Sequence, residues 1–423
     1  MLSLKLKEWL GPLGVKAILV FLSLRSSDIA NLLCRLYLGK KLSSDDFGAI
    51  DPVYAFLSIF SIPIIGVFQI ASKSLSRFIT LGKALESRCL LYDMTLIAIT
   101  GSLLSIGAFI CVRSFVLTRL HLTSEYTPII ALLFFIAWLV PFSSAIYQGW
   151  QKYQIMVFQC VLSSIAILAL SVMFVGKLDY GLLGAMFAKI IPALFPVIAI
   201  AVILTPVLSG TKKRDSDEFR LMKEMFVPVN IYLGTIAILT NVIPLFIRNF
   251  NLGQSGGYSA LATFGIIPSY FIASIVFVIF PVAAAEHAAG NEINRLYKGA
   301  VTIGILVTIA CVILFYFTAE PIMQLWNVDF VPYAKYLWIY ALAMGMNGVI
   351  QVVASVKMAR HEYSFLWFLV LPSIAMCVLL YFCRTFLDVP IAIATLVIIH
   401  ALILTCLGIS ELMNRKKTHA LLT

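Results

Sequence analysis

Charge is what this chain has least of. Of its 423 residues, 12% are Asp, Glu, Lys or Arg and 61% are hydrophobic, whereas a soluble domain carries about 25% charged residues. A chain with so few charged side chains cannot cover a soluble globular domain with a solvated surface. The composition therefore predicts a polytopic membrane protein.

Several patterns that mark common chemistries are also missing. The sequence has no phosphate-binding loop and no zinc-binding helix motif. Its eight cysteines all fall in or beside apolar runs without the close spacing of a metal knuckle, so we interpret them as buried thiols. No predicted outer link exceeds about 16 residues, which leaves no outer domain for acidic catalytic residues. We expect no enzyme activity, no metal and no other cofactor.

What the sequence has in abundance is long apolar runs. A helix needs about 20 mostly apolar residues to cross the roughly 30 Å hydrocarbon layer, and backbone groups in that layer must be satisfied internally. The runs therefore predict an all-α fold with twelve transmembrane helices. The predicted spans are residues 15–38, 50–72, 89–111, 128–148, 156–175, 182–205, 227–247, 260–284, 299–319, 333–355, 364–383 and 391–412.

The distribution of Lys and Arg predicts the orientation. The set of alternate links that includes both termini holds 20 of these residues, and the opposite set holds 7. Because cytoplasmic loops carry the excess of basic residues, both termini are predicted to be cytoplasmic. We interpret the net charge of +11 as topology and not as nucleic acid binding. Residues 35–51, RLYLGKKLSSDDFGAID, are then predicted to form an outer loop whose acidic pair is solvated.

A polar interruption at residues 205–226 divides six spans from six. The run Phe68-Gln69-Ile70-Ala71 lies 212 residues before Phe280-Pro281-Val282-Ala283, close to half the chain. Six is an even number, so both halves enter the membrane from the same side and a repeat would be parallel. We predict two six-helix lobes related by a pseudo-two-fold axis along the membrane normal. The predicted parts are an N-terminal lobe (1–205), a cytoplasmic linker (206–226), a C-terminal lobe (227–412) and a cytoplasmic tail (413–423).

Ionisable residues inside spans are default functional candidates, because they are expensive to hold in a membrane. The first span carries Arg25, Asp28, Asn31 and Arg35, and its three charged residues fall within an arc of roughly 80° over about 15 Å of helix. We predict that this stripe lines a translocation cavity together with Lys189 of the sixth span. Arg25 and Asp28 are three residues apart, so an internal ion pair that makes the helix insertable is the open alternative.

The sign of these charges bears on the substrate. A cavity for cationic drugs should concentrate carboxylates, whereas the candidates here are three basic residues and one carboxylate. An excess of positive charge favours an anionic substrate such as a pyrophosphate, to which Arg donates paired hydrogen bonds. Asp28 is the candidate for proton or sodium coupling.

Three regions resemble the bacterial polysaccharide flippase family. Arg35-Leu36-Tyr37-Leu38-Gly39 followed by Asp46-Phe47-Gly48 resembles that family's first-loop pattern, and Gln148-Gly149-Trp150-Gln151-Lys152-Tyr153 is similar to its link after the fourth span. Three further stretches resemble the eighth-span region of that family: Gly257-Tyr258-Ser259-Ala260, Gly265-Ile266-Ile267-Pro268 and Phe280-Pro281. The resemblance implies the polysaccharide branch of a superfamily shared with multidrug extrusion antiporters, whose members have two six-helix lobes around a central cavity.

Members of that branch move undecaprenyl-pyrophosphate-linked repeat units from the cytoplasmic to the outer leaflet by alternating access, for O-antigen, capsule or exopolysaccharide. The resemblance implies a place in the bacterial cytoplasmic (inner) membrane. It implies a polyprenyl-pyrophosphate-linked glycan as substrate, and a polysaccharide polymerase and chain-length machinery as partners. Three alternatives stay open: an ion-coupled multidrug extrusion antiporter, a peptidoglycan-precursor flippase and a membrane-bound polymerase, the last being poorly matched to the short outer loops.

Overall fold

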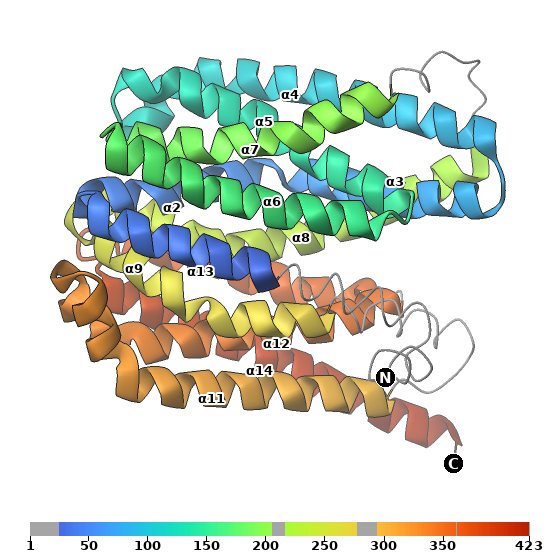
Figure 1. Ribbon diagram of the computed structural model, residues 1–423. Coiled ribbons are helices and arrows are strands. Elements are labelled where there is room, and N and C mark those ends of the chain that lie inside the picture. Colours follow the sequence, from blue (N-terminus) through green and yellow to red (C-terminus); the bar gives the residue numbers. More distant parts are fainter. Residues whose placement is uncertain (1–24, 205–215, 277–293, 361, 423) are drawn as a thin grey trace, which may run out of the picture. The chain divides into compact units, whose positions relative to one another are not determined.

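The computed structural model describes residues 25–204, 216–276, 294–360 and 362–422 (Figure 1). Within these ranges every regular element is a helix. In the same ranges ten helices are long and apolar enough to cross a membrane, or eleven if two segments bent by 43°, Leu252–Gly265 and Ile267–Val276, form one span. The predicted all-α, polytopic membrane fold is confirmed. The first predicted span, 15–38, lies partly outside the described residues.

The chain divides into two compact units. Unit 1 holds Met1–Asp46 and Phe56–Asn230, and unit 2 holds Phe47–Ala55 and Ile231–Thr423. The units follow the two halves of the sequence except at Phe47–Ala55, which comes from the first half and clusters with the second.

Within unit 1 the helices pack as consecutive and next-but-one neighbours, α3 and α4 on α5, and α5 and α6 on α7. Its elements are residues 25–41, the parts of α2 (Ser44–Phe60) outside residues 47–55, α3 (Ile62–Thr80), α4 (Ala84–Leu120), η1 (Ser124–Tyr126), α5 (Thr127–Gly149), α6 (Tyr153–Ser171), the π-helical η2 (Val172–Lys177), α7 (Gly181–Leu204) and the start of α8 (Ser216–Phe250).

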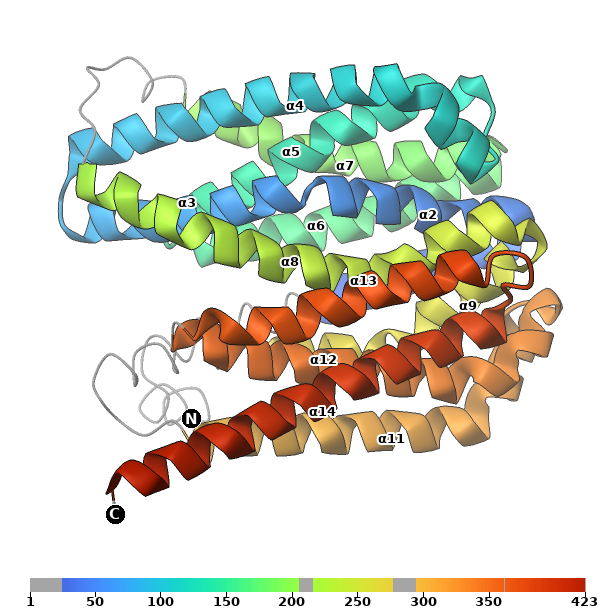
Figure 2. The ribbon, with the colours of Figure 1, turned by 180° about the vertical axis from the view of Figure 1, so that it is seen from behind.

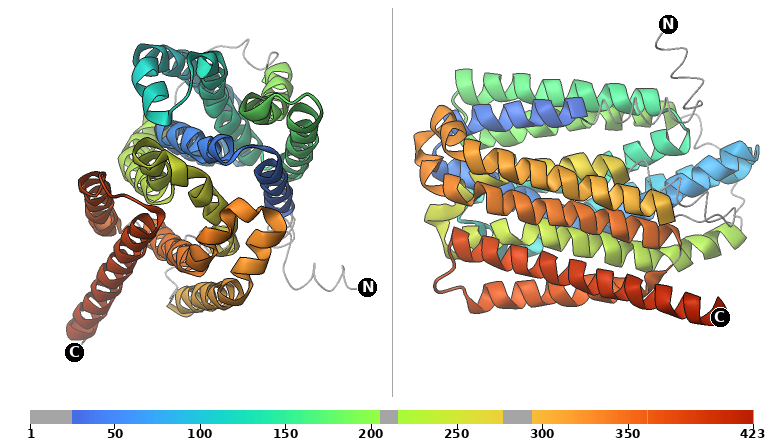
Figure 3. Two further views of the ribbon diagram at one scale, coloured as in Figure 1. Left: turned by 90° about the vertical axis from the view of Figure 1, so that its left-hand side faces the viewer. Right: turned by 90° about the horizontal axis from the view of Figure 1, so that it is seen from below.

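In unit 2, α12 lies between α11 and α14, and α13 packs on α14 (Figure 2, Figure 3). Its elements are residues 47–55 of α2, most of α8, η3 (Leu252–Gln254), α9 (Ser255–Gly265), residues 267–276, α11 (Asn294–Trp326), η4 (Val328–Tyr336), α12 (Leu337–Ala359), η5 (Tyr363–Leu366), α13 (Trp367–Phe382) and α14 (Val389–Leu422).

The prediction of a loop at residues 35–51 is wrong, because nearly all of this segment is helical. Helix 25–41 runs past Arg35, and α2 begins at Ser44. The Ser43 hydroxyl accepts a hydrogen bond from the Asp46 backbone N–H at 3.1 Å, and two aspartates occupy the first turn of α2. A capping Ser and acidic residues in the first turn stabilise a helix start, since they satisfy free N–H groups and complement the helix dipole. Because of this capping pattern, α2 begins several residues before the apolar run that predicted the span.

The second span of each half is interrupted. Ser61 separates α2 from α3 in the first half, and Ile266 separates α9 from residues 267–276 in the second. Pro63 and Pro268 each stand second in the segment after the break, where the missing N–H of proline has no helical partner to lose. The shared interruption adds a structural likeness to the predicted repeat. The repeat member Phe280-Pro281-Val282-Ala283 lies outside the described residues.

The predicted linker is partly helical. Since α8 begins at Ser216, the second part of the predicted segment 206–226 belongs to that helix. Residues 205–215 lie outside the described residues. The predicted tail after residue 412 continues α14, which extends to Leu422.

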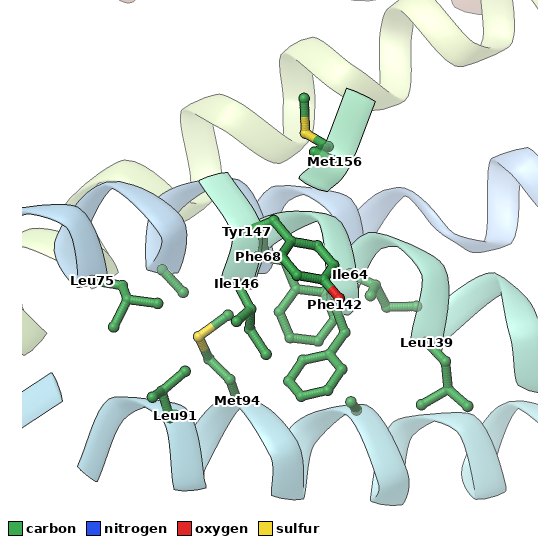
Figure 4. Close-up of a cluster of buried hydrophobic side chains, with 13 residues drawn as sticks. Ile64, Phe68, Leu75, Leu91, Met94, Leu139, Phe142, Ile146, Tyr147 and Met156 are labelled. Carbon is green, nitrogen blue, oxygen red and sulfur yellow. The ribbon is translucent and has the colours of Figure 1, made fainter. Parts of the chain in front are cut away.

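The core of unit 1 is a cluster of apolar side chains from α3 to α6 (Figure 4). Tyr147 is buried within it and satisfies its hydroxyl by accepting a hydrogen bond from Gln159 Nε2 at 3.0 Å. The cluster fixes the helices that support helix 25–41 and α7. Its members are Ile64, Phe68, Ala71, Leu75, Leu91, Met94, Ala98, Leu139, Phe142, Ala145, Ile146, Tyr147 and Met156.

The contact between α4 and α5 yields a stability test. A Cβ atom at Gly101 would overlap the indole of Trp138, whereas one at Gly107, six residues along α4, would meet no atom within 4 Å. We expect Gly101→Ala to destabilise the protein by about 1–3 kcal/mol, since overpacking forces side chains from their rotamers. The matched Gly107→Ala should be neutral or slightly stabilising. Thermal unfolding of both purified variants in detergent measures the difference, and equal midpoints would contradict the packing argument.

Candidate functional site

The five residues predicted to line a cavity all belong to unit 1. Four lie on helix 25–41 and the fifth, Lys189, lies on α7. Arg25, Asp28 and Arg35 are half-buried, whereas Asn31 and Lys189 are exposed. The polar stripe of the first helix is therefore accessible over part of its length.

The first two charged residues of the stripe form an ion pair. Arg25 Nη1 lies 2.9 Å from Asp28 Oδ2, with side-chain exposures of 19% and 29%. The structure thus forms the internal pair that the sequence left open as an alternative. In this pair the charge of Arg25 offsets the charge of Asp28, which is the carboxylate considered for ion coupling.

The charges of the other two basic residues, Arg35 and Lys189, both act on Cys34. The buried Cys34 thiol lies 3.2 Å from the Ser171 hydroxyl and interacts electrostatically with both Arg35 and Lys189. Residues 35 and 189 are far apart in sequence, so the packing of helix 25–41, α6 and α7 creates this neighbourhood. No carboxylate is among the groups that act on this thiol in the described structure. The result is a local concentration of positive charge.

A glycine allows helix 25–41 to pack closely at this point, and two prolines shape α7 next to Lys189. Gly176, in the π-helical η2 that ends α6, lies directly against the Tyr37 hydroxyl, and any Cβ there would overlap it. On α7, Pro192 and Pro196 follow Lys189 within two turns. A proline has no N–H for the carbonyl four residues earlier, so the stretch of α7 around Lys189 carries polar backbone as well as the ammonium group.

Other polar residues inside the spans bond to the backbone of their own helix. The side chains of Asn230 and Asn241 donate to carbonyls four residues earlier on their own helix, at 2.8 and 3.0 Å, and not to other helices. His400 is fully buried and has Nδ1 2.7 Å from the Leu396 carbonyl. Within the described structure its Nε2 and both amide atoms of the buried Asn347 have no hydrogen-bond partner. His400 and Asn347 belong to unit 2, whereas the five candidate residues belong to unit 1.

Sequence reasoning missed the ion network of unit 2. Lys357 is 3% exposed, and its Nζ lies 3.4 Å from Glu362 Oε2 and 3.3 Å from Glu411 Oε2. Glu411 is on α14, so the network ties that helix to α12. Lys357 follows the predicted span 333–355, and charged residues at span ends usually extend to the headgroups. Because Glu411 lies 54 positions away in the sequence, no local sequence pattern predicts this ion pair. In the described ranges no group of three or more His, Cys, Asp or Glu residues is placed to hold a metal ion.

Comparison with solved structures identifies the fold of this chain. No family model matches the sequence, and no curated protein matches it. Among solved structures, the inward-facing conformation of a multidrug resistance MATE family transporter of the MOP superfamily aligns with a TM-score of 0.75 at 13% identity, covering 96% of this chain and 98% of that chain. A mutant of the Vibrio cholerae MATE transporter VcmN aligns with a TM-score of 0.68 at 14% identity, covering 93% and 95%.

The outward-facing conformation of a multidrug resistance MATE family transporter aligns with a TM-score of 0.67 at 14% identity, covering 96% of both chains. At such low identity the alignments speak for the fold. The chain has the two-lobe helical fold of the MATE family transporters.

The ion pair of helix 25–41 can be tested by a double-mutant cycle. Arg25→Gln and Asp28→Asn should each destabilise the protein by about 1–3 kcal/mol, because each leaves a half-buried charge without its partner. The double variant should be more stable than the sum of the two effects predicts. Lys40→Gln, at an exposed position of the same helix, is the control. Unfolding midpoints in detergent measure all four, and strict additivity would show that the pair contributes nothing.

Proposed function

We propose that this chain is a membrane transporter that works by alternating access on an amphiphilic substrate with an anionic head group. The observation that carries the proposal is the pair of cations around Cys34, Arg35 and Lys189. Because Arg25 already offsets Asp28, the five candidate residues have a net charge of +2. A site of this charge attracts anions and repels cationic solutes.

A pyrophosphate-linked lipid fits this chemistry. The guanidinium group of Arg35 supplies a planar fork for two phosphate oxygens, and the ammonium of Lys189 supplies a mobile point charge. Lys189 is exposed and Arg35 is half-exposed, so neither must leave a buried position to meet a ligand. In this proposal the head group and its sugars occupy the site while the polyprenyl tail stays in lipid. Undecaprenyl-pyrophosphate-linked oligosaccharide, the substrate implied by the resemblance, is the first candidate.

Ion coupling is assigned to Asp28 in the same proposal. A proton or a sodium ion bound to that carboxylate competes with Arg25, which lies 2.9 Å away. Cation binding would release the guanidinium group, and the released Arg25 would add a third positive charge to the polar stripe. The proposal thus links cation binding to anion affinity through one ion pair. It places the protein in the bacterial inner membrane with cytoplasmic termini.

Export of drugs is the second candidate, and likeness to solved structures favours it over the first. The transporters matched above are multidrug transporters. An antiporter for cationic drugs would need an available carboxylate, and Asp28 would take that part only after separation from Arg25. Peptidoglycan-precursor lipids also carry a pyrophosphate, so their chemistry is that of the first candidate and the assay must include them.

Purified protein in liposomes separates the candidates. We expect movement of undecaprenyl-pyrophosphate-linked oligosaccharide across the bilayer, with initial rates lowered at least about tenfold by Arg35→Gln and by Lys189→Gln, equivalent to about 1.4 kcal/mol each. Lys177→Gln, which removes an exposed lysine from η2 of the same unit, is the matched control and should keep the wild-type rate.

Two results would contradict the proposed substrate. Unchanged glycan movement in both variants would remove Arg35 and Lys189 from the site. Gradient-dependent transport of a cationic dye without any glycan movement would establish the second candidate. Preference for the peptidoglycan precursor over the oligosaccharide would keep the anionic site and change the lipid.

A further inference from the structure

One end of unit 1 is rich in basic residues. Residues 73–88 and 149–155, at the α3–α4 and α5–α6 corners, contain five basic residues and one acidic residue, Glu86. Topology accounts for the sign of these charges, but it does not say what they contact in the folded protein. The basic residues are Lys73, Arg77, Lys83, Arg88 and Lys152.

The structure joins the two corners into one surface. Gln151 Nε2 donates a hydrogen bond to Ser76 Oγ at 3.1 Å, although Gln151 must adopt a left-handed φ of 56° that non-glycine residues rarely take. Next to it, a Cβ atom at Gly149 would overlap the Leu75 side chain. The α5–α6 corner therefore lies against the last turns of α3. We call residues 73–88 and 149–155 together the corner surface.

A line of exposed leucines runs along α4 to the corner surface. Leu85, Leu96 and Leu103 are 47%, 50% and 58% exposed, and their spacing places them within about 20° of one line along the helix. At 1.5 Å per residue this line is about 27 Å long, close to the roughly 30 Å thickness of the hydrocarbon layer. It marks the face of α4 that contacts lipid, with Leu85 at one end.

Basic residues stand at that end of the line. Arg88 is exposed and lies three residues after Leu85, on the neighbouring turn of the same side of α4. Lys83 lies in the connection 81–83, where Leu81 is 57% exposed. Exposed leucines beside cations at the end of a lipid-facing line are what a surface in the head-group layer presents. The cations of the corner surface therefore meet lipid head groups.

Two of these cations are held over aromatic rings. Lys83 Nζ lies 5.8 Å from the ring centroid of Phe78, and Lys152 Nζ lies 5.3 Å from that of Trp150. A ring beneath an ammonium group attracts it through the ring quadrupole, and Trp is enriched at the level of the head groups. The rings restrict both lysines before any lipid binds, which lowers the entropy lost on binding.

We propose that the corner surface binds the head groups of anionic phospholipids. Its Lys and Arg side chains donate charge-assisted hydrogen bonds to the lipid phosphate, while Leu81 and Leu85 contact the start of the acyl chains. A zwitterionic phospholipid carries the same phosphate with an ammonium group that the neighbouring cations repel, so the surface selects lipids with a net negative charge. It contains none of the five candidate residues, and the inference does not depend on which substrate is moved.

Native mass spectrometry of the purified full chain in detergent, titrated with phosphatidylglycerol or phosphatidylcholine, tests the proposal. We expect phosphatidylglycerol to bind first and at lower concentration. The triple variant Lys83→Gln, Arg88→Gln, Lys152→Gln should raise its half-saturating concentration at least about tenfold, equivalent to about 1.4 kcal/mol. The charge-conserving triple variant Lys83→Arg, Arg88→Lys, Lys152→Arg should keep most of the affinity.

The matched control is Arg119→Gln, Lys335→Gln, Arg384→Gln. It removes the same number of charges from exposed residues that also lie over aromatic rings, on α4, η4 and the turn after α13. We expect this variant to keep the wild-type affinity for phosphatidylglycerol. An equal loss in both triple variants would overturn the proposal, because binding would then follow net charge and not the corner surface.

Three further results would overturn it. The first is equal affinity of the wild-type protein for phosphatidylcholine. The second is phosphatidylglycerol binding that does not weaken as salt is raised, since exposed charges are screened. The third is an equal rise in unfolding midpoint with inorganic phosphate alone, which would make the surface a site for phosphate from any source. Selective phosphatidylglycerol binding combined with no movement of glycan or dye would reject the proposed function and keep this surface.

Discussion

Every backbone N–H and C=O group in the hydrocarbon layer must find a partner inside the protein, and this constraint shapes the whole chain. It makes every regular element in the described ranges a helix. It also explains where breaks are tolerated. Pro63 and Pro268 stand in the first turn after a break, where no helical bond is lost. Pro52 stands inside α2, and the carbonyl it leaves open is satisfied from another helix, by Ser255. A defect in one helix thus becomes a contact between two.

Charged groups in the same medium divide into two kinds. Lys357 is held by Glu362 and Glu411, and Arg25 is held by Asp28; such pairs make burial possible and tie or stabilise helices. Arg35 and Lys189 are the two basic candidates whose charges both act on Cys34, a thiol hydrogen-bonded to Ser171. Sign and position, not the number of charges, make this second pair the candidate for binding a substrate.

The fold and the charges address different questions. Alignment over 96% of the chain with MATE family transporters establishes how the helices are arranged, but a fold serves many functions and the residues of the site decide among them. In the proposed function, the likeness of the fold speaks for a drug exporter and the local charge speaks for an anionic lipid. Both candidates are membrane transporters.

The sequence by itself determined the helical membrane fold and the polar stripe of the first span, because length and apolarity of a run act locally. It misplaced residues 35–51, where a capping Ser and two aspartates start a helix in a stretch that polarity alone marks as a loop. Only the tertiary structure decided that the charges of Arg35 and Lys189 both act on Cys34, that Lys357 reaches Glu411 and that Phe47 packs against Trp326 in the second unit. Those pairings depend on how helix faces dock, and docking across more than 50 residues leaves no periodic signal in the chain.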